Sequence, residues 1–146
     1  MSSRFLLDTC VLVHIVRGDA SGKQIQRDYN LKAFYSECLI SVVTRGEMEK
    51  LGREFEWPSP KLQKMRDLLD QLITVDINTE SIIANYAEID HFSGLLGHKM
   101  GKNDVWIAAT AKSTGYQLMT MDRDFDHLDN VHLSLIFIDP QSHKSP

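Results

Sequence analysis

Short apolar runs alternate along the chain with longer segments whose apolar residues recur every three or four positions. The short runs are bounded by acidic or turn residues and predict buried strands at residues 4–8, 38–42, 73–77, 116–121 and 133–138. The longer segments predict helices at about 9–17, 22–36, 44–55, 60–72, 79–96 and 103–114. Strands that alternate with helices predict an α/β fold, with a mainly parallel sheet of four or five strands between two layers of helices.

Polar residues and glycines mark the ends of several predicted helices. We expect Thr9 to cap the first helix and Gly18 to stop it. Ser41 or Thr44 is expected to open the helix that follows the second strand. Asn103 is expected to cap the last helix. Thr9 directly follows the first predicted strand and Ser41 lies near the end of the second, so these strand ends and helix starts should meet at one edge of the sheet.

The length and composition predict one globular domain. The chain has 146 residues, of which 42% are hydrophobic and 25% charged, both average values for such domains. We expect residues 1–139 to form the domain and 140–146 a flexible tail. No stretch approaches the ~20 apolar residues of a membrane span, and no cleavage site follows the apolar N-terminal run, so we expect a cytoplasmic protein. The two cysteines, Cys10 and Cys38, lack the paired spacing of a zinc site or a disulfide framework.

The overall charge excludes one class of function and leaves another open. The chain carries 16 Lys and Arg against 20 Asp and Glu, a formal net charge of −4. A protein that coats nucleic acid would usually be basic. A nuclease that concentrates its acids on metal ions is not excluded, because a bound divalent cation reverses the local field.

Four acidic residues lie where predicted strands end or predicted helices begin. Asp8 ends the first strand, Asp122 follows the fourth, and Glu47 and Asp104 lie in the first turns of two helices. In α/β folds of this kind, the ligand site lies beyond the carboxyl ends of the strands. Four carboxylates gathered there would repel one another strongly without a cation. Hard oxygen ligands favour Mg²⁺ or Mn²⁺, which also bind phosphate groups, so the cluster predicts phosphodiester hydrolysis.

Three of these four acids also have a simpler interpretation. Asp104 suits the dipole at a helix start, Asp122 suits a turn after a strand, and Glu47 could be a solvated partner of Lys50. Only Asp8, which interrupts an apolar run, resists such an explanation. The shared metal site is preferred because it accounts for all four positions together.

Four sequence blocks resemble those of a known family. The blocks are Leu7-Asp8-Thr9, residues 41–48 (SVVTRGEM), residues 103–111 (NDVWIAATA) and residues 120–125 (TMDRDF). In this order and with apolar spacers between them, they resemble the blocks of PIN domains, and most of all the VapC-type toxins of bacterial toxin–antitoxin pairs. The resemblance runs from Arg4 to about Ile138, which is nearly the whole chain.

The resemblance implies a fold, a reaction and partners. It implies a parallel sheet between helices, Mg²⁺- or Mn²⁺-dependent cleavage of RNA that leaves a 5′-phosphate and a 3′-hydroxyl, and a cognate antitoxin that holds the enzyme inactive. It carries the catalytic and metal-binding roles onto the four acids Asp8, Glu47, Asp104 and Asp122. It gives supporting roles to three neighbours, Thr9, Thr120 and Asp124. Cys10 departs from the pattern, because many relatives have Asn there, and this puts the hydrogen bonding near Asp8 in question.

Basic, aromatic and histidine side chains near the blocks are weaker candidates. RNA phosphates could be bound by four cations: Lys99, Lys102, Arg123 and Arg45. Solvated surface positions explain these side chains about equally well. For Trp106 we favour packing in a core or dimer contact over stacking on a base. The histidines, including His91 and His98, lack metal-ligand spacing, so surface or structural roles are favoured.

The sequence therefore predicts a metal-dependent endoribonuclease, most simply a VapC-like toxin that forms a homodimer. A housekeeping RNA-processing nuclease would carry the same acids. A non-catalytic PIN module that binds RNA or a protein partner is an alternative from another class, and a structure-specific DNA nuclease ranks lowest. The apolar helices after Glu47 could receive an antitoxin helix or a second subunit, although core packing explains them equally well.

Overall fold

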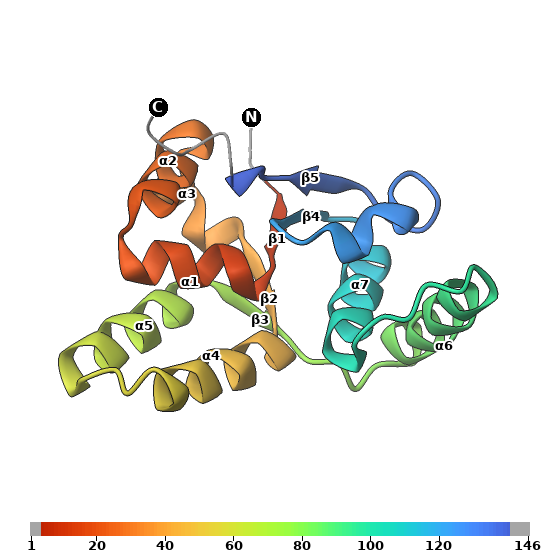
Figure 1. The fold of residues 1–146 in the computed structure, drawn as a ribbon, viewed down its shortest axis with the longest axis horizontal. Helices are drawn as coiled ribbons and strands as arrows, with labels where there is room; N and C mark the ends of the chain where they lie inside the picture. The colour runs from red at the N-terminus through yellow and green to blue at the C-terminus, as the bar shows by residue number, and fades with distance from the viewer. Residues whose placement is uncertain (1–3, 141–146) are drawn as a thin grey trace.

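The central feature of the fold is a five-stranded parallel sheet flanked by helices on both faces, as the sequence predicts (Figure 1). A computed structural model describes residues 4–140; residues 1–3 and most of the tail predicted from residue 140 onward lie outside the described part. The strands lie in the order β3-β2-β1-β4-β5. Their bounds are β1 (Phe5–Leu7), β2 (Leu39–Ser41), β3 (Ile73–Val75), β4 (Gln117–Thr120) and β5 (Leu135–Phe137).

The helices follow the predicted order, with one predicted helix divided and two short 3₁₀ segments added. They are α1 (Thr9–Arg17), α2 (Ala20–Tyr29), α3 (Leu31–Phe34), α4 (Val42–Glu54), α5 (Ser59–Gln71), α6 (Glu80–Leu95) and α7 (Lys102–Thr114), with 3₁₀ turns η1 (Tyr35–Glu37) and η2 (Arg123–Leu128). The single helix predicted at 22–36 was wrong. Asn30 adopts a left-handed conformation with φ of 50° and separates α2 from α3, which an Asn side chain tolerates better than most.

Alternating side chains of the strands build two separate cores. In β1, Phe5 and Leu7 face the layer of α1, α2 and α5, whereas Leu6 faces α6 and α7. In β2, Ile40 and Leu39 divide in the same way. This follows from the two-residue period of a strand, which sends successive side chains to opposite faces. Both faces are therefore apolar, and the polar residues of these segments are confined to the strand ends.

Two predicted helix caps need correction. Asp8, not Thr9, is the N-cap of α1, because its carboxylate accepts a hydrogen bond from the Thr9 backbone N–H. The last helix begins at Lys102 after a Gly101 cap, so Asn103 lies inside its first turn. The prediction for Gly18 was confirmed, since this glycine ends α1 with φ of 64°. An acid that ends a strand and caps the next helix is held at a defined position between the two elements.

The strand order places a topological switch point at the middle of the sheet. The chain starts at the central strand β1, passes to β2 and β3 on one side, and then crosses to β4 and β5 on the other. Leu7 pairs with Met119, and the Asp8 backbone N–H donates to the Met119 carbonyl over 3.0 Å. Ligands of open parallel sheets bind at the carboxyl ends of strands beside such a switch point. Asp8 and the residues that follow β4 lie there.

None of the helices formed by residues 4–140 is both long enough and apolar enough to cross a membrane.

Candidate metal-binding nuclease site

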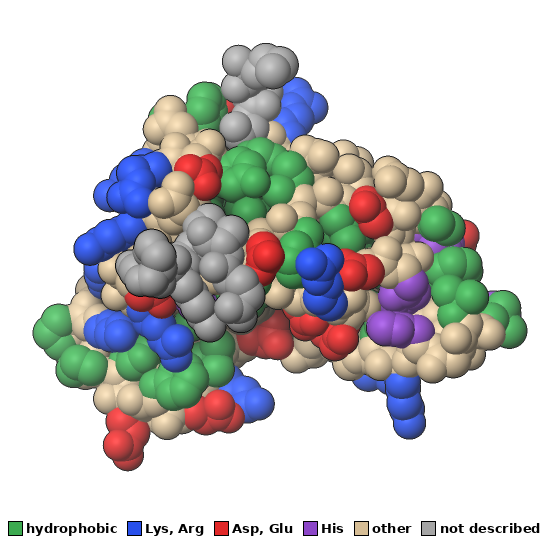
Figure 2. All heavy atoms as spheres, turned by 45° about the horizontal axis from the view of Figure 1, so that its top comes forward, with side chains coloured by type: hydrophobic (Ala, Val, Ile, Leu, Met, Phe, Trp, Pro, Cys, Tyr) green, Lys and Arg blue, Asp and Glu red, His purple; other side chains and the backbone are tan. Residues whose placement is uncertain are grey.

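A pocket of about 330 Å³ opens at the carboxyl end of β1 and β4, between α1, α4 and α7. Its lining combines acidic, basic and apolar side chains: Asp8, Thr9, Cys10, Val13, His14, Arg17, Glu47, Leu51, Phe55, Asp104 and Asp122. Figure 2 shows Asp and Glu side chains gathered near the centre of one face of the molecule, with histidines to one side. The structure therefore brings all four acids predicted from the sequence to one pocket.

Asp8 forms the deep wall of the pocket and is saturated with hydrogen bonds. Only 4% of the residue is exposed. Its Oδ1 accepts from the Thr9 backbone N–H at 2.8 Å, and its Oδ2 accepts from the Thr120 hydroxyl at 2.7 Å and from the Cys10 thiol at 3.3 Å. Burial raises the pKa of Asp8 above its ordinary value, although these hydrogen bonds oppose the shift. The surrounding donors thus fix the orientation of this carboxylate.

Hydrogen bonds through two side chains connect the deep wall to the residues that follow β4. The Thr120 hydroxyl accepts from the Asp122 backbone N–H at 3.0 Å while it donates to Asp8. The Cys10 sulfur accepts from the Met121 backbone N–H at 3.4 Å while its thiol donates to Asp8. Two side chains therefore connect the end of β1 to the turn that carries Asp122, and they hold the two acids at a fixed separation.

The polar contacts of Cys10 could not be predicted from the sequence. Its apolar neighbours in the sequence gave no sign of a polar partner, and only the register between β1 and β4 brings its sulfur to the Met121 N–H. The departure from Asn at this position leaves the hydrogen bonding intact, because the thiol both donates and accepts. Burial, followed by the charge of Asp8, raises the pKa of the Cys10 thiol, which therefore stays protonated.

Glu47 reaches the pocket from the second turn of α4. Its Oε1 accepts a 2.7 Å hydrogen bond from the Thr9 hydroxyl, which also lies 3.2 Å from the Thr44 hydroxyl. The proposed solvated pair with Lys50 is not formed, since Lys50 instead pairs with Glu54. Glu47 is thereby held beside the end of β1.

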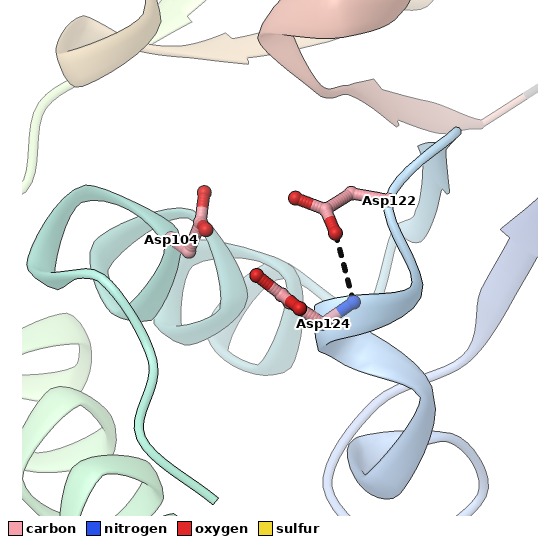
Figure 3. A group of neighbouring side chains, drawn as sticks. All are labelled: Asp104, Asp122 and Asp124. Carbon is pink, nitrogen blue, oxygen red and sulfur yellow. Dashed lines mark hydrogen bonds between the residues drawn. The ribbon is translucent and has the colours of Figure 1, made fainter.

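Asp104, Asp122 and Asp124 form the outer wall, and their carboxylates point toward a common space (Figure 3). One oxygen from each lies within 4.8 Å of the others. Asp104 comes from the first turn of α7, whereas Asp122 and Asp124 flank the start of η2. Asp122 caps η2 by accepting a 2.8 Å hydrogen bond from the Asp124 backbone N–H. Within residues 4–140, no Lys or Arg lies within ion-pair distance of these three acids.

Burial and neighbouring acids together raise the pKa of Asp104 to about 7. Burial of its carboxyl is the largest cause, and the negative charges of Asp8, Asp122, Glu47 and Asp124 follow. A divalent cation would relieve this repulsion. The donors are hard carboxylate oxygens, which fit Mg²⁺ or Mn²⁺. The residues present therefore fit the metal that the sequence predicts.

None of the cations predicted to bind RNA lines the acidic pocket. Arg45 binds Asp70 and Thr74 at the β3 side of the sheet, and Lys102 pairs with Asp90. Arg123 pairs with Asp126 and lies 3.7 Å above the ring of Phe137. The exposed side chain of Lys99 is also absent from the lining. The basic side chains in the pocket are those of His14 and Arg17, which helical spacing along α1 could have indicated.

Trp106 and the histidines have structural contacts. Trp106 stacks on Tyr86 with ring centroids 4.0 Å apart and packs against the core on the α6 and α7 side, which confirms the packing interpretation. The ring centroids of His98 and His127 lie 4.1 Å apart. The Nε2 atom of His98 lies 3.1 Å from the Asp124 carbonyl oxygen. The His98 ring therefore contacts the backbone of the segment that carries Asp124.

Comparisons with known proteins agree with the geometry. The sequence profile of the family described as PIN domain matches residues 5–131. Ribonuclease VapC2 of Haemophilus influenzae is 24% identical over 126 residues, which span 86% of this chain and 92% of that relative.

Two solved structures share the fold. One is VapBC2 from Rickettsia felis bound to a DNA fragment from their promoter, with a TM-score of 0.76 and 20% identity over 92% of this chain and 98% of that one. The other is DNA-bound VapBC from Salmonella typhimurium, with a TM-score of 0.75 and 23% identity over 94% and 98% of the two chains. The fold agrees with these neighbours, and because the profile match covers most of the sequence, this chain belongs to the PIN domain family.

Proposed function

We propose that the protein is a divalent-metal-dependent endoribonuclease of the VapC type. The observation that carries this proposal is the meeting of five carboxylates at the switch point of the sheet, with no Lys or Arg paired to any of them within residues 4–140. Unneutralised carboxylates at such a site favour a cation as their partner. The similarity to a VapC ribonuclease supports RNA as the substrate.

The proposed metal ligands are Asp8, Asp104 and Asp122, with Glu47 binding directly or through water. Asp124 joins this set because its carboxylate lies with those of Asp104 and Asp122. A bound Mg²⁺ or Mn²⁺ would supply positive charge to the phosphate oxygens and increase the acidity of water at neutral pH.

The protein's own groups prepare this site before any substrate arrives. Hydrogen bonds from Thr120 and Cys10 orient the Asp8 carboxylate. Thr9 holds Glu47 at the edge of the pocket. Because these contacts exist among protein groups alone, little rearrangement would be needed when charge develops on the phosphate, which is how preorganised polar sites lower a barrier.

Cleavage of total RNA by the purified protein tests the proposal. The expected result is cutting with Mg²⁺ or Mn²⁺, its loss with EDTA and its loss in Asp104→Asn. Mapping of the cut ends should give 5′-phosphates and 3′-hydroxyls. Binding of RNA without cutting, by folded protein free of any co-purified inhibitor and with either ion, would instead support the non-catalytic module.

We further propose that the chain is the toxin of a toxin–antitoxin pair and acts as a homodimer in the cytoplasm. Its structural neighbours include VapBC complexes, which favours an antitoxin partner over an independent housekeeping role. Expression of the chain should arrest growth, and co-expression of a neighbouring small gene should relieve the arrest. Absence of toxicity in several hosts would favour the housekeeping nuclease, and light scattering tests the dimer.

A further inference from the structure

The acidic pocket continues as a trough between two helices. Its lining residues on α1 run from Thr9 to Arg17, and those on α4 and its cap run from Glu47 through Leu51 to Phe55. Each series spans nine residues, and the eight steps from first to last correspond to about 12 Å along a helix. The two helices contact each other and lead away from the sheet side by side (Figure 1). The trough therefore has carboxylates at the sheet end and an Arg–Phe pair at the other.

Phe55 is placed for contact with a ligand rather than for core packing. Its residue is 48% exposed, and it belongs to neither hydrophobic core. It caps α4, and its backbone N–H donates to the Leu51 carbonyl over 2.9 Å, which fixes the start of the side chain. Its ring lies 6.2 Å from that of Trp57, which is buried and limits its movement on one side. An exposed and positioned aromatic ring is suited to stacking on a flat partner.

Arg17 provides a positive charge beside this ring. It is the last residue of α1, and its guanidinium carbon lies 5.1 Å from the centroid of Phe55. Within residues 4–140 no carboxylate lies within 4.0 Å of this guanidinium, although its charge is the last of the causes that lower the pKa of Asp19. Arg66, by contrast, is paired with Glu49 through two hydrogen bonds. A favourable interaction with the helix dipole explains an Arg at this position, but it does not explain why the exposed ring lies in the same pocket as the acids.

We propose that Arg17 and Phe55 form a nucleotide-binding subsite for single-stranded RNA, an inference that rests on the proposed nuclease function. A nucleotide whose phosphate lies at the carboxylate end would direct its base or the next phosphate along the trough. Phe55 stacks on the base, and Arg17 contacts the backbone phosphate or the face of the base. A volume of about 330 Å³ lies at the small end of ligand pockets and suits one nucleotide of an extended strand.

The chemistry of the trough favours RNA over a protein segment. The trough joins a proposed metal site, which needs a phosphate, to a cation and an aromatic ring, which match the next phosphate and base. Base stacking on an aromatic ring tolerates every base. The subsite would therefore strengthen binding without selecting a sequence, and any sequence preference would arise elsewhere.

Fluorescence anisotropy of labelled oligo(U) and oligo(A) strands with Mg²⁺ tests the subsite, in an Asp104→Asn background that is expected not to cut. Phe55→Ala should weaken binding of both strands about 10-fold, and Phe55→Trp should restore it. Arg17→Ala should weaken binding several-fold and lower the salt dependence by about one phosphate contact. Two exposed residues outside the trough provide matched controls: Arg53→Ala on α4 for the arginine and Leu95→Ala on α6 for the apolar ring. Neither substitution should change the affinity for RNA.

The outcomes separate this subsite from the nuclease proposal. If the native chain cuts RNA but Phe55→Ala and Arg17→Ala bind as tightly as the background, the subsite is wrong and the nuclease stands. If these variants bind RNA normally but no longer bind a co-expressed inhibitor protein, the trough is a protein-docking surface and the RNA subsite is again wrong. If neither the native chain nor the background protein binds RNA with Mg²⁺ or Mn²⁺, both proposals fail.

Discussion

The deep and outer walls of the pocket differ in how their carboxylates are satisfied. Asp8 in the deep wall accepts hydrogen bonds from three neighbouring residues and is almost fully buried. Asp104 in the outer wall is half-buried and faces other acids. A carboxylate held by donors contributes to the fold, whereas crowded carboxylates work against it until a cation binds. Substitutions in the two walls should therefore have opposite effects on stability, even where both abolish activity.

The largest expected effect is that substitutions in the outer wall abolish RNA cleavage without lowering the stability of the protein. Asp104→Asn or Asp122→Asn should lower the rate of RNA cleavage by at least about 100-fold, comparable to removal of one major electrostatic contact in an active site. The melting temperature of the metal-free protein should stay the same or rise, because one repelling charge is gone. Asp126→Asn, outside the pocket, is the control. A marked fall in melting temperature for Asp104→Asn would remove the distinction between the walls.

Substitution in the deep wall should reduce stability as well as activity. Asp8→Ala removes the N-cap of α1 and leaves the Thr120 hydroxyl without its acceptor. The expected loss is about 1–3 kcal/mol in the free energy of unfolding, measured by urea denaturation. Asp8→Asn should lose less, because Asn is also a good N-cap. Equal stability of Asp8→Ala and the native chain would show that these hydrogen bonds do not stabilise the fold.

The crowded outer wall predicts a pH dependence of the metal-free protein. The pKa of Asp104 is about 7 in the folded protein, against an ordinary value of 3.8 for an Asp carboxyl, so the folded state holds its proton more tightly than the unfolded chain. The contribution of the Asp104 carboxyl to the stability of the protein should therefore be most favourable below about pH 4 and become less favourable as the pH rises toward 7. The melting temperature measured in EDTA should fall by a few degrees between pH 5 and pH 8, and it should fall less in Asp104→Asn. Saturating Mg²⁺ should reverse the decline, and a flat profile in the native chain would contradict it.

The smallest expected effect concerns the thiol that joins the two walls. Cys10→Ala leaves the Met121 N–H without its acceptor and removes one donor to Asp8. The protein should lose about 1 kcal/mol of stability and lose cleavage less than about tenfold. Cys38→Ala is the matched thiol control, since Cys38 lies in an apolar core and should affect stability alone. An unchanged rate in Cys10→Ala would mean that the hydrogen bond from the Cys10 thiol to Asp8 does not contribute to catalysis.

The sequence was sufficient to predict the parallel sheet, the alternation of helices and the acids that meet at its switch point. Short apolar runs identify strands reliably when each ends at an acid, as β1 ends before Asp8. The fragmentation at Asn30 was missed because a left-handed residue inside a helical pattern leaves no periodic signal. The corrected caps show that a residue such as Asp8 can end a strand and start a helix at once.

The site could be predicted only in part, because several of its contacts depend on register. The contact of Cys10 with Met121 requires the pairing of β1 with β4. The closeness of Asp124 to Asp104 requires the 3₁₀ segment η2, whereas the sequence predicted only a turn after the fourth strand. The proposed RNA-binding cations were chosen for nearness in sequence to the acids, whereas Arg17 reaches the pocket through helical spacing along α1.

Calorimetric titration of Mn²⁺ into the purified, EDTA-treated protein tests the metal site most directly. The expected result is saturable binding by the native chain, at least about tenfold weaker in Asp104→Asn and in Asp122→Asn, and unchanged in Asp126→Asn. Equal Mn²⁺ affinity in the native chain and in both pocket variants would contradict the assignment of these carboxylates as metal ligands.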